Sequence, residues 1–321
     1  MEKVVEAIRK YRKFLITAHV NMEGDSLGSQ LAMKELLRRL GKAAFIVDDD
    51  TVPPHYMFLP GADEVSNKMD GKLDFDAALV LDCPTLKRAG RVKDLISKDK
   101  FIINIDHHIS NEEFGDVNWV DPRASSAGEM VFKLFKAMGV ALTKEIALSL
   151  YIAILTDTGS FNYDNTSRIT HEIAGELLGY GLDPAAVSEN VYERRSVADI
   201  KFLGLVLSKI KVLRGGEVAY LEITKKMLKD TGVDVSKSEG LVNYARSIDK
   251  ARVAMLFRED PKEKGAISVS FRSKGDVNVN KIASHFGGGG HMKASGCVFK
   301  GSLSDVERKI LAKVEEVLER K

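Results

Sequence analysis

Residues 101–105 form an apolar segment that runs directly into Asp106, His107 and His108. Four of the five residues are apolar, which is typical of a buried strand in a parallel sheet. Ligands bind at the carboxyl ends of the strands in an open α/β sheet, so this order places an acid and two imidazoles at the binding edge. Such a position favours metal ligation or acid–base chemistry over packing. The alternative is a polar loop that contains a histidine pair by chance.

The same order of a strand followed by polar residues occurs near the N-terminus. Residues 13–18 predict a strand, and a helix is predicted after the next loop, ending at about Leu40. His19, Glu23 and Asp25 lie in or next to this loop, where they would converge on one cation. Capping of the helix by Asp25 or Ser26 is the alternative, but capping alone does not require a histidine and two acids within seven residues.

Further acidic residues follow predicted elements in the first half of the chain. Asp82 ends a predicted strand over 75–81, and Asp157 follows a predicted helix over 144–155. A carboxylate at Asp82 can join the cluster near the N-terminus. Residues 48–50 are three adjacent aspartates after another predicted strand. Adjacent side chains at a strand end point in different directions, so these three predict a solvated turn and not a ligand set.

The composition limits the class of protein and its partners. At 321 residues the chain is long for one hydrophobic core, so two domains are expected. The net charge of +2 argues against long duplex nucleic acid as a partner. Cys83 and Cys297 lie far apart, which argues against a disulfide framework. No run approaches the about 18 apolar residues that a membrane span requires. With no signal-peptide pattern at the N-terminus, we expect a cytoplasmic protein without membrane attachment.

The pattern of elements divides the chain into two domains and a linker. Strand and helix signals alternate through about residue 188, which predicts an α/β fold with a doubly wound parallel sheet over 1–188. Residues 189–211 predict one long charged helix as the linker. Residues 212–321 predict a smaller α/β domain with a mixed sheet. Its strands are expected at 218–223, 251–258, 266–273 and 294–299.

A run of four glycines precedes His291 in the second domain. Glycines let backbone N–H groups approach a phosphate or a base without steric hindrance. Arg272, at the end of a predicted strand, adds a charge that is suited to bidentate phosphate contact. A flexible loop is the alternative for the glycine run. The substrate-binding candidates are Arg272, Gly288, Gly289, Gly290 and His291, with Arg258 and His285 as weaker ones.

Acidic and histidine side chains at the ends of predicted elements make up a second candidate site, in the first domain. They are His19, Glu23, Asp25, Asp82, Asp106, His107, His108 and Asp157. Carboxylate and imidazole without thiolate favour a borderline-hard divalent ion such as Mn²⁺ over a structural zinc site. Because these ligands are too many for one ion, a bridging carboxylate would hold two. Two-metal sites are suited to in-line displacement at phosphorus.

The candidate residues resemble the motifs of a known family, the DHH phosphoesterases. The similarity lies in the His19-x-x-x-Glu23-x-Asp25 spacing, the isolated Asp82, the triplet that begins at Asp106, and Asp157. The glycine run before His291 resembles the signature of the accessory DHHA1 domain. The five motifs span nearly the whole chain in the family's order. One position departs from the family, because the first motif usually carries Asp where this chain has Glu23.

The resemblance implies a role for each residue of the first domain's motifs. One Mn²⁺ would take His19, Glu23 and Asp82. A second Mn²⁺ would take Asp25, Asp82, His107 and Asp157, so that Asp82 bridges the two ions. Asp106 would orient its neighbours without binding metal, and His108 would face the phosphate or the leaving group. Asp106 and His108 are therefore the catalytic candidates.

Within the family, the chain is most similar to the stand-alone two-domain members of the nanoRNase and cyclic-dinucleotide phosphodiesterase type. This similarity implies hydrolysis of short oligoribonucleotides and linear dinucleotides such as 5′-pApA to mononucleotides by water activated at two metals, with cyclic di-AMP as a further candidate. A 3′-phosphoadenosine 5′-phosphate phosphatase is the alternative, also as a second activity. A nucleotide-binding sensor without turnover is the non-enzyme alternative. A homodimer is a further expectation from the resemblance.

Overall fold

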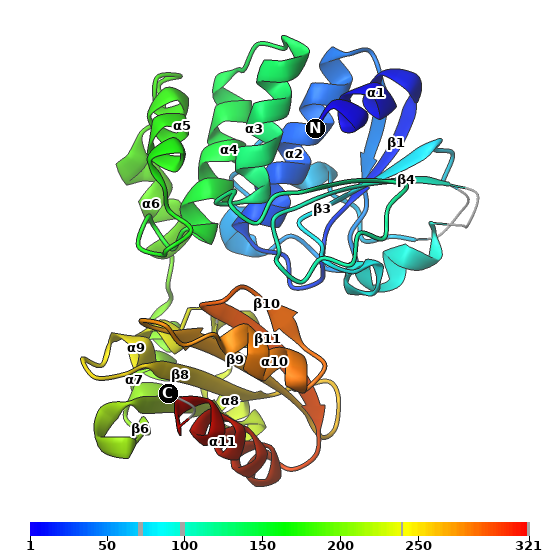
Figure 1. The fold of residues 1–321 in the computed structure, drawn as a ribbon. Helices are drawn as coiled ribbons and strands as arrows, with labels where there is room; N and C mark the ends of the chain where they lie inside the picture. Colours follow the sequence, from blue (N-terminus) through cyan, green and yellow to red (C-terminus); the bar gives the residue numbers. More distant parts are fainter. Residues whose placement is uncertain (70–72, 97–99, 239, 320–321) are drawn as a thin grey trace. The chain divides into compact units, whose positions relative to one another are not determined.

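A five-stranded sheet forms the centre of the first of two units, Met1–Arg194 and Arg195–Lys321, in a computed structural model of the chain (Figure 1). The structure describes residues 1–69, 73–96, 100–238 and 240–319. Every strand pairing in the first sheet is parallel, as the sequence predicted. The order across this sheet is β2 (Ala43–Ile46), β1 (Lys13–Thr17), β3 (Ala77–Leu81), β4 (Phe101–Asp106) and β5 (Val117–Val120).

Both faces of this sheet are covered, which explains the continuous apolar runs of its strands. Phe14 and Ile16 belong to a core that includes side chains from the helices, whereas Leu15 belongs to a separate cluster that includes Val92. Among the described residues, that second face is covered by the 3-10 helix η3 and by loop segments, and no α-helix contributes to it. The helices are α1 (Glu2–Lys10), α2 (Gly24–Arg39), α3 (Ala127–Met138), α4 (Lys144–Asp157), α5 (Arg168–Leu178) and α6 (Pro184–Tyr192). The 3-10 helices are η1 (Pro54–Tyr56), η2 (Ala62–Glu64) and η3 (Leu86–Asp94).

Glycines allow α2, α3 and α4 to lie side by side with close backbone contact (Figure 1). A Cβ atom on Gly28 of α2 would lie 2.3 Å from the carbonyl oxygen of Ser149 in α4. A Cβ atom on Gly128 of α3 would lie 2.4 Å from the Cβ of Ala153. Neither position has room for a larger residue unless the helices move apart. Two of these helices, α2 and α4, carry Asp25 and Asp157 to the edge of the sheet.

Gly28→Ala is therefore expected to lower the free energy of unfolding by about 1–3 kcal/mol, because the new methyl group would overlap the backbone of α4. Gly175→Ala in α5 is the matched control, since a Cβ there would meet nothing within 4 Å. That substitution is expected to stabilise the helix by about 0.5–1 kcal/mol. Urea unfolding of the two variants, followed by circular dichroism, measures both changes. Equal losses in both variants would contradict the packing argument.

The second unit contains a mixed six-stranded sheet, which confirms the predicted fold class. β7 and β8 pair in parallel, and the other neighbours pair antiparallel. The order is β10 (Gly289–Gly290), β11 (Ala294–Lys300), β9 (Ala266–Ser273), β8 (Val253–Glu259), β7 (Val218–Ile223) and β6 (Lys211–Leu213). The helices are α7 (Val197–Leu207), α8 (Lys225–Thr231), α9 (Val242–Ser247), α10 (Val279–His285) and α11 (Leu303–Glu319), with the 3-10 turns η4 (Arg214–Gly216) and η5 (Val235–Ser238).

The single long helix predicted over residues 189–211 is wrong. α6 ends at Tyr192, α7 begins at Val197, and residues from Lys211 onwards form β6. The break has a local cause, because Ser196 and Asp199 form a capping box that starts a new helix. The Ser196 hydroxyl accepts from the Asp199 N–H at 3.1 Å, and the Asp199 carboxylate accepts from the Ser196 N–H at 2.8 Å.

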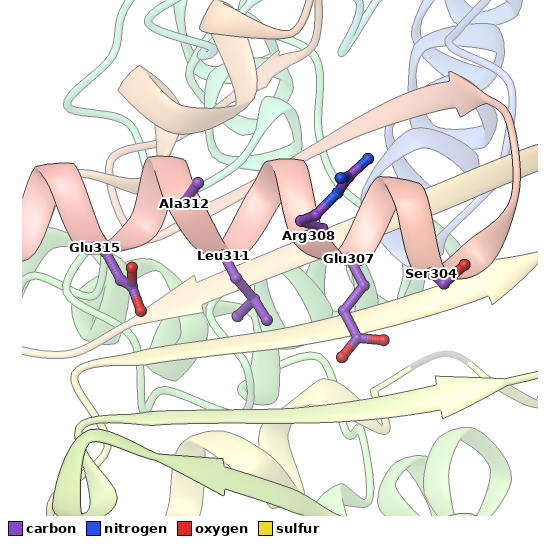
Figure 2. A pocket seen from close by; sticks show the side chains of 6 residues that line it. All are labelled: Ser304, Glu307, Arg308, Leu311, Ala312 and Glu315. Carbon is purple, nitrogen blue, oxygen red and sulfur yellow. The ribbon is translucent and has the colours of Figure 1, made fainter.

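An open pocket of about 460 Å³ lies along α11 in the second unit. Figure 2 shows its lining side chains, which are Ser304, Glu307, Arg308, Leu311, Ala312 and Glu315. None of the predicted site residues lines it. Glu307 also lies 3.4 Å from the Lys211 amine and accepts a hydrogen bond from the Tyr220 hydroxyl. Within the described residues, no helix is long and apolar enough to cross a membrane.

Candidate metal centre

The carboxyl ends of β1, β3 and β4 bring the predicted ligands of the first unit together. His19 lies just beyond β1, Asp82 directly follows β3, and His107 directly follows β4. Asp25 lies in the first turn of α2, and Asp157 is the last residue of α4. The order of the strands reverses between β1 and β3, which is where open α/β sheets bind their ligands.

His19 faces two carboxylates through one ring nitrogen. Its Nε2 lies 3.3 Å from Glu23 Oε1 and 3.3 Å from Asp82 Oδ2. Its Nδ1 lies 2.7 Å from the carbonyl oxygen of Val20, which places a proton on Nδ1 and turns Nε2 towards the carboxylates. Burial disfavours the imidazolium, but Asp82 and Glu23 outweigh burial and raise the pKa of His19 to about 10. The three groups thus attract a cation.

His107 faces a second set of carboxylates. Its Nε2 lies 3.4 Å from Asp82 Oδ1, 3.6 Å from Asp25 Oδ2 and 3.6 Å from Asp157 Oδ2. Burial opposes protonation of His107, yet the surrounding acids raise its pKa well above the ordinary value. Burial also raises the pKa of Asp25 well above its usual value, aided by the charge of Asp82, and raises the pKa of Asp157 to about 6. A divalent cation would relieve this crowding of buried acids.

Asp82 connects the two sets, because its two oxygens face in different directions. Oδ2 is directed at His19 and Oδ1 at His107. Oδ2 is buried and accepts no hydrogen bond from the described residues. Burial opposes ionisation of Asp82, but His19 and His107 hold its pKa well below the ordinary range. An ionised carboxylate with a buried oxygen of this kind is suited to ligate metal, and its geometry fits a bridge between two ions.

Asp25 is held in place by the N-terminus of α3. Its oxygens accept from the N–H groups of Ala127 at 2.7 Å and Gly128 at 2.9 Å, and from the Ser29 hydroxyl at 3.0 Å. Asp157 Oδ2 accepts from the amide of Asn165 at 3.2 Å. The sequence analysis did not single out these supporting groups, because their side chains carry no motif of their own. Such contacts orient metal ligands in other proteins.

Asp106 lies behind the two histidines that follow it. Its Oδ1 accepts from the N–H of His107 at 2.9 Å and lies 2.7 Å from Nδ1 of His108. This contact places a proton on Nδ1 of His108 and leaves Nε2 as the ring nitrogen for a ligand. The catalytic roles of Asp106 and His108 stay predictions.

The solvated turn predicted for residues 48–50 is wrong at Asp48, whereas Asp49 and Asp50 lie in a bend and are half-buried. Asp48 is buried, with 3% of its surface exposed. It accepts from the Thr17 hydroxyl and from the N–H of Ala18, both at 3.1 Å. Asp49 accepts from the N–H of Arg91 at 2.9 Å, and Asp50 accepts from the N–H groups of the loop after His19. Asp48 and Asp50 therefore hold the backbone on either side of His19, and Asp49 holds the backbone at Arg91.

Two of the candidate phosphate-binding elements of the second unit flank β11, because Arg272 lies on β9 and Gly289 and Gly290 form β10. Arg272 of β9 pairs with Ala294 of β11, and the carbonyl oxygen of Ala294 accepts from the N–H of His291 at 2.7 Å. Nε of Arg272 is buried and has no hydrogen-bond partner among the described residues. Arg258 instead donates to Ser268 at 3.0 Å and Ser238 at 2.8 Å. His285 ends α10 and is exposed.

Homology decides between the possible families of this site. Residues 13–154 match the DHH family, N-terminal domain, and residues 215–320 match the DHHA1 domain. The bifunctional oligoribonuclease and PAP phosphatase NrnA of Thermus thermophilus is 36% identical over 95% of this chain and 90% of its own length. The chain belongs to the DHH family. The protein of the same name from Bacillus subtilis is 31% identical to this DHH protein, over 92% of the chain and 91% of its own length.

A solved structure supports the same assignment of the DHH and DHHA1 domains. The exopolyphosphatase-related protein from Bacteroides fragilis has a TM-score of 0.88 and 29% identity, and the match covers 99% of this chain and 97% of that protein. DHH phosphoesterases are metal-dependent, and the described residues include three groups that share Asp82 and could hold metal ions. They are His19, Glu23 and Asp82; Asp25, Asp82 and His107; and Asp82, Asp106 and His108.

The glycine run of the DHHA1 domain has a structural role in addition to the predicted one. A Cβ on Gly288 would lie 2.1 Å from the carbonyl oxygen of Gly296, and one on Gly290 would lie 2.6 Å from that of Ala294. Gly289 pairs with Gly296 in the ladder between β10 and β11. The run is therefore part of the sheet and not a free loop. Contact between its N–H groups and a phosphate stays a prediction.

Glu23 is the residue where this DHH domain departs from the usual motif, and it offers a test of the first ligand set. Glu23→Ala is expected to weaken the binding of one metal ion by about 10–100-fold, because a carboxylate oxygen 3.3 Å from His19 Nε2 is lost. Glu23→Asp is the matched variant and should lose no more than about tenfold, since it keeps the charge. Isothermal titration with Mn²⁺ measures both affinities. Unchanged binding of both ions by Glu23→Ala would exclude Glu23 as a ligand.

Proposed function

We propose that this chain is a phosphodiesterase that hydrolyses short oligoribonucleotides and linear dinucleotides such as 5′-pApA to mononucleotides. The reaction would use two divalent metal ions, and Mn²⁺ is the first candidate for both. The observation that carries the proposal is the position of Asp82, whose two oxygens face separate sets of imidazole and carboxylate groups. The names of the two NrnA relatives support the same substrate class. The net charge of +2 also fits short substrates better than long duplexes.

The residues of the first unit would divide the catalytic work between them. His19, Glu23 and Asp82 would hold one ion, and Asp25, Asp82, His107 and Asp157 the other. When bound, two such ions supply a nucleophile at neutral pH and stabilise charge on the phosphate oxygens. Asp106 keeps the proton of His108 on Nδ1, so that Nε2 contacts the phosphate or the leaving oxygen. Burial of Asp25 and Asp82 keeps water away from their carboxylates and strengthens every charge interaction there.

Arg272 of the DHHA1 domain would bind the terminal phosphate of the substrate, with His291 and the N–H groups of the glycine run. Arg272→Ala is expected to raise KM by about 10–100-fold and to change kcat little, because the contact acts on substrate and transition state alike. Arg272→Lys should recover part of the affinity, since it keeps the charge but not the bidentate geometry. Steady-state kinetics on 5′-pApA measures the change, and an unaltered KM would remove Arg272 from the substrate site.

Removal of the 3′-phosphate from 3′-phosphoadenosine 5′-phosphate is a second candidate activity. The names of the relatives carry both functions, and the same pair of ions would serve a monoester as well as a diester. The non-enzyme candidate is a nucleotide-binding sensor without turnover. Only one feature favours it, which is Glu23 in place of the usual Asp of the first motif. If Glu23→Asp turned over substrate and the unaltered chain did not, the sensor would be the correct function. A cytoplasmic location and a homodimer stay predictions.

The test is an assay of the purified chain with Mn²⁺ on a panel of substrates. The panel contains 5′-pApA, cyclic di-AMP, 3′-phosphoadenosine 5′-phosphate, a short RNA and a long RNA duplex. We expect rapid hydrolysis of 5′-pApA and short RNA, with little turnover of the duplex. If 3′-phosphoadenosine 5′-phosphate were the only compound hydrolysed, the proposed activity would be a phosphatase and not a phosphodiesterase. If the chain bound metal but hydrolysed none of the compounds, the proposal that it is an enzyme would be wrong.

A further inference from the structure

Asn104 is a polar residue in the middle of the apolar strand β4, and none of its surface is exposed. A buried amide is costly unless it is hydrogen-bonded. Its Nδ2 donates to the carbonyl oxygens of Val80 at 3.1 Å and Cys83 at 3.2 Å. These two carbonyls lie on either side of Asp82 in the chain. Asn104 therefore connects β4 to the turn that carries the bridging carboxylate.

That turn has a conformation that needs support. Asp82 has a φ of 48°, in the left-handed region that residues with a Cβ rarely adopt. Such a conformation persists where the surroundings hold it. The N–H of Asp82 donates to the carbonyl oxygen of Ile105 at 2.9 Å, and Asn104 holds the backbone before and after it. These bonds hold the backbone from which the Asp82 side chain projects.

A second amide extends this contact to the catalytic triplet. Asn111, in the loop after His108, donates to Asp106 Oδ2 at 2.6 Å and to Asn104 Oδ1 at 2.8 Å. Its own Oδ1 accepts from the N–H of Glu113 at 2.7 Å. The other oxygen of Asp106 is the one that faces Nδ1 of His108. Asn111 therefore fixes the rotation of the Asp106 carboxylate.

We infer that Asn104 and Asn111 are a pair of positioning residues, in which Asn104 aims the bridging carboxylate of Asp82 and Asn111 aims Asp106 and, through it, the ring of His108. This inference rests on the proposed function of the site. The direct bond between the two amides couples the two tasks, so a change at either one disturbs Asp82 and Asp106 together. Amides suit these places because each must donate to oxygens, which a carboxylate of the same shape cannot do.

Asn111→Ala and Asn104→Leu are the test variants, and Asn118→Ala is the matched control. Asn118 lies beside Asn104 in β5 and bonds to Glu113 and Gly115 of the same loop, but it makes no hydrogen bond to Asp82 or Asp106. We expect kcat on 5′-pApA to fall by about 10–100-fold in Asn111→Ala with KM within threefold. Asn104→Leu should weaken Mn²⁺ binding by about 10–100-fold. Asn118→Ala should change neither quantity more than about threefold.

A readout that does not depend on turnover separates this inference from the proposed function. The Nδ1 proton of His108 should give a hydrogen-bonded NMR signal in the unaltered chain that is shifted or lost in Asn111→Ala and kept in Asn118→Ala. If the unaltered chain hydrolysed nothing, that signal and the Mn²⁺ affinities would still test the pair. An unchanged signal and affinity in Asn111→Ala and Asn104→Leu would overturn the inference. Equal losses in Asn118→Ala, or failure of both variants to fold, would also overturn it in favour of a general role in stability.

Discussion

Asp82→Ala is expected to release both metal ions and to lower kcat/KM by more than about 10³-fold. The reason is geometric, because the Asp82 oxygens lie 3.3 Å from His19 Nε2 and 3.4 Å from His107 Nε2 and so face both proposed ligand sets. No other carboxylate among the described residues is placed between these two rings in the same way. Metal content measured by mass spectrometry after dialysis, together with the rate on 5′-pApA, gives both quantities.

Asp76→Ala is the matched control for this variant. Asp76 lies at the amino end of the same strand, where its carboxylate accepts from the N–H groups of Arg12 at 3.1 Å and Lys13 at 3.0 Å. Asp76→Ala removes a carboxylate that bonds to the backbone but does not alter the candidate metal centre. This variant is therefore expected to bind two metal ions and to keep full activity. Two ions retained by Asp82→Ala would show that Asp82 does not bridge them.

His108→Ala is expected to lower kcat by about 10²–10⁴-fold while both ions stay bound. His108 belongs to neither proposed ligand set, and its Nδ1 is engaged by Asp106 at 2.7 Å. Loss of the ring therefore removes a contact to the phosphate or the leaving group and spares the metals. Rates with saturating Mn²⁺, measured beside the metal content, distinguish this variant from Asp82→Ala.

His171→Ala is the control for the histidine variant, because His171 is exposed on α5 and stacks on the ring of Phe161 with centroids 5.1 Å apart. The expected change in kcat for this control is within about twofold. If His108→Ala lost metal as readily as Asp82→Ala, His108 would be a ligand, and its proposed contact with substrate would be wrong.

The grouping of the proposed ligands was predictable from the sequence because parallel strands end at one edge. His19, Asp82 and His107 each follow a strand whose apolar pattern is clear, and at that shared edge Asp82 lies 3.3 Å from His19 and 3.4 Å from His107. Asp157 was predictable in the same way from the end of a helix. The separation of the ligands along the chain did not matter, because the topology and not the spacing determines where they meet.

The supporting groups were not predictable, since their partners lie far away in the chain. Asp48 is buried because it bonds to Thr17 and Ala18, about thirty residues earlier, and no local pattern shows that. Residues 48–50 therefore resembled a polar turn. The glycine run illustrates a second limit, because a close approach such as that of Gly288 to Gly296 depends on strand pairing. A glycine can be required for packing as well as for a ligand.

The central claim is that Asp82 bridges two metal ions, and anomalous X-ray diffraction from crystals grown with Mn²⁺ tests it most directly. The account predicts two anomalous peaks about 3.5–4 Å apart. Asp82 should contact both, with His19 and Glu23 at one ion and Asp25, His107 and Asp157 at the other. A single peak, or two peaks that do not share Asp82, would contradict the account.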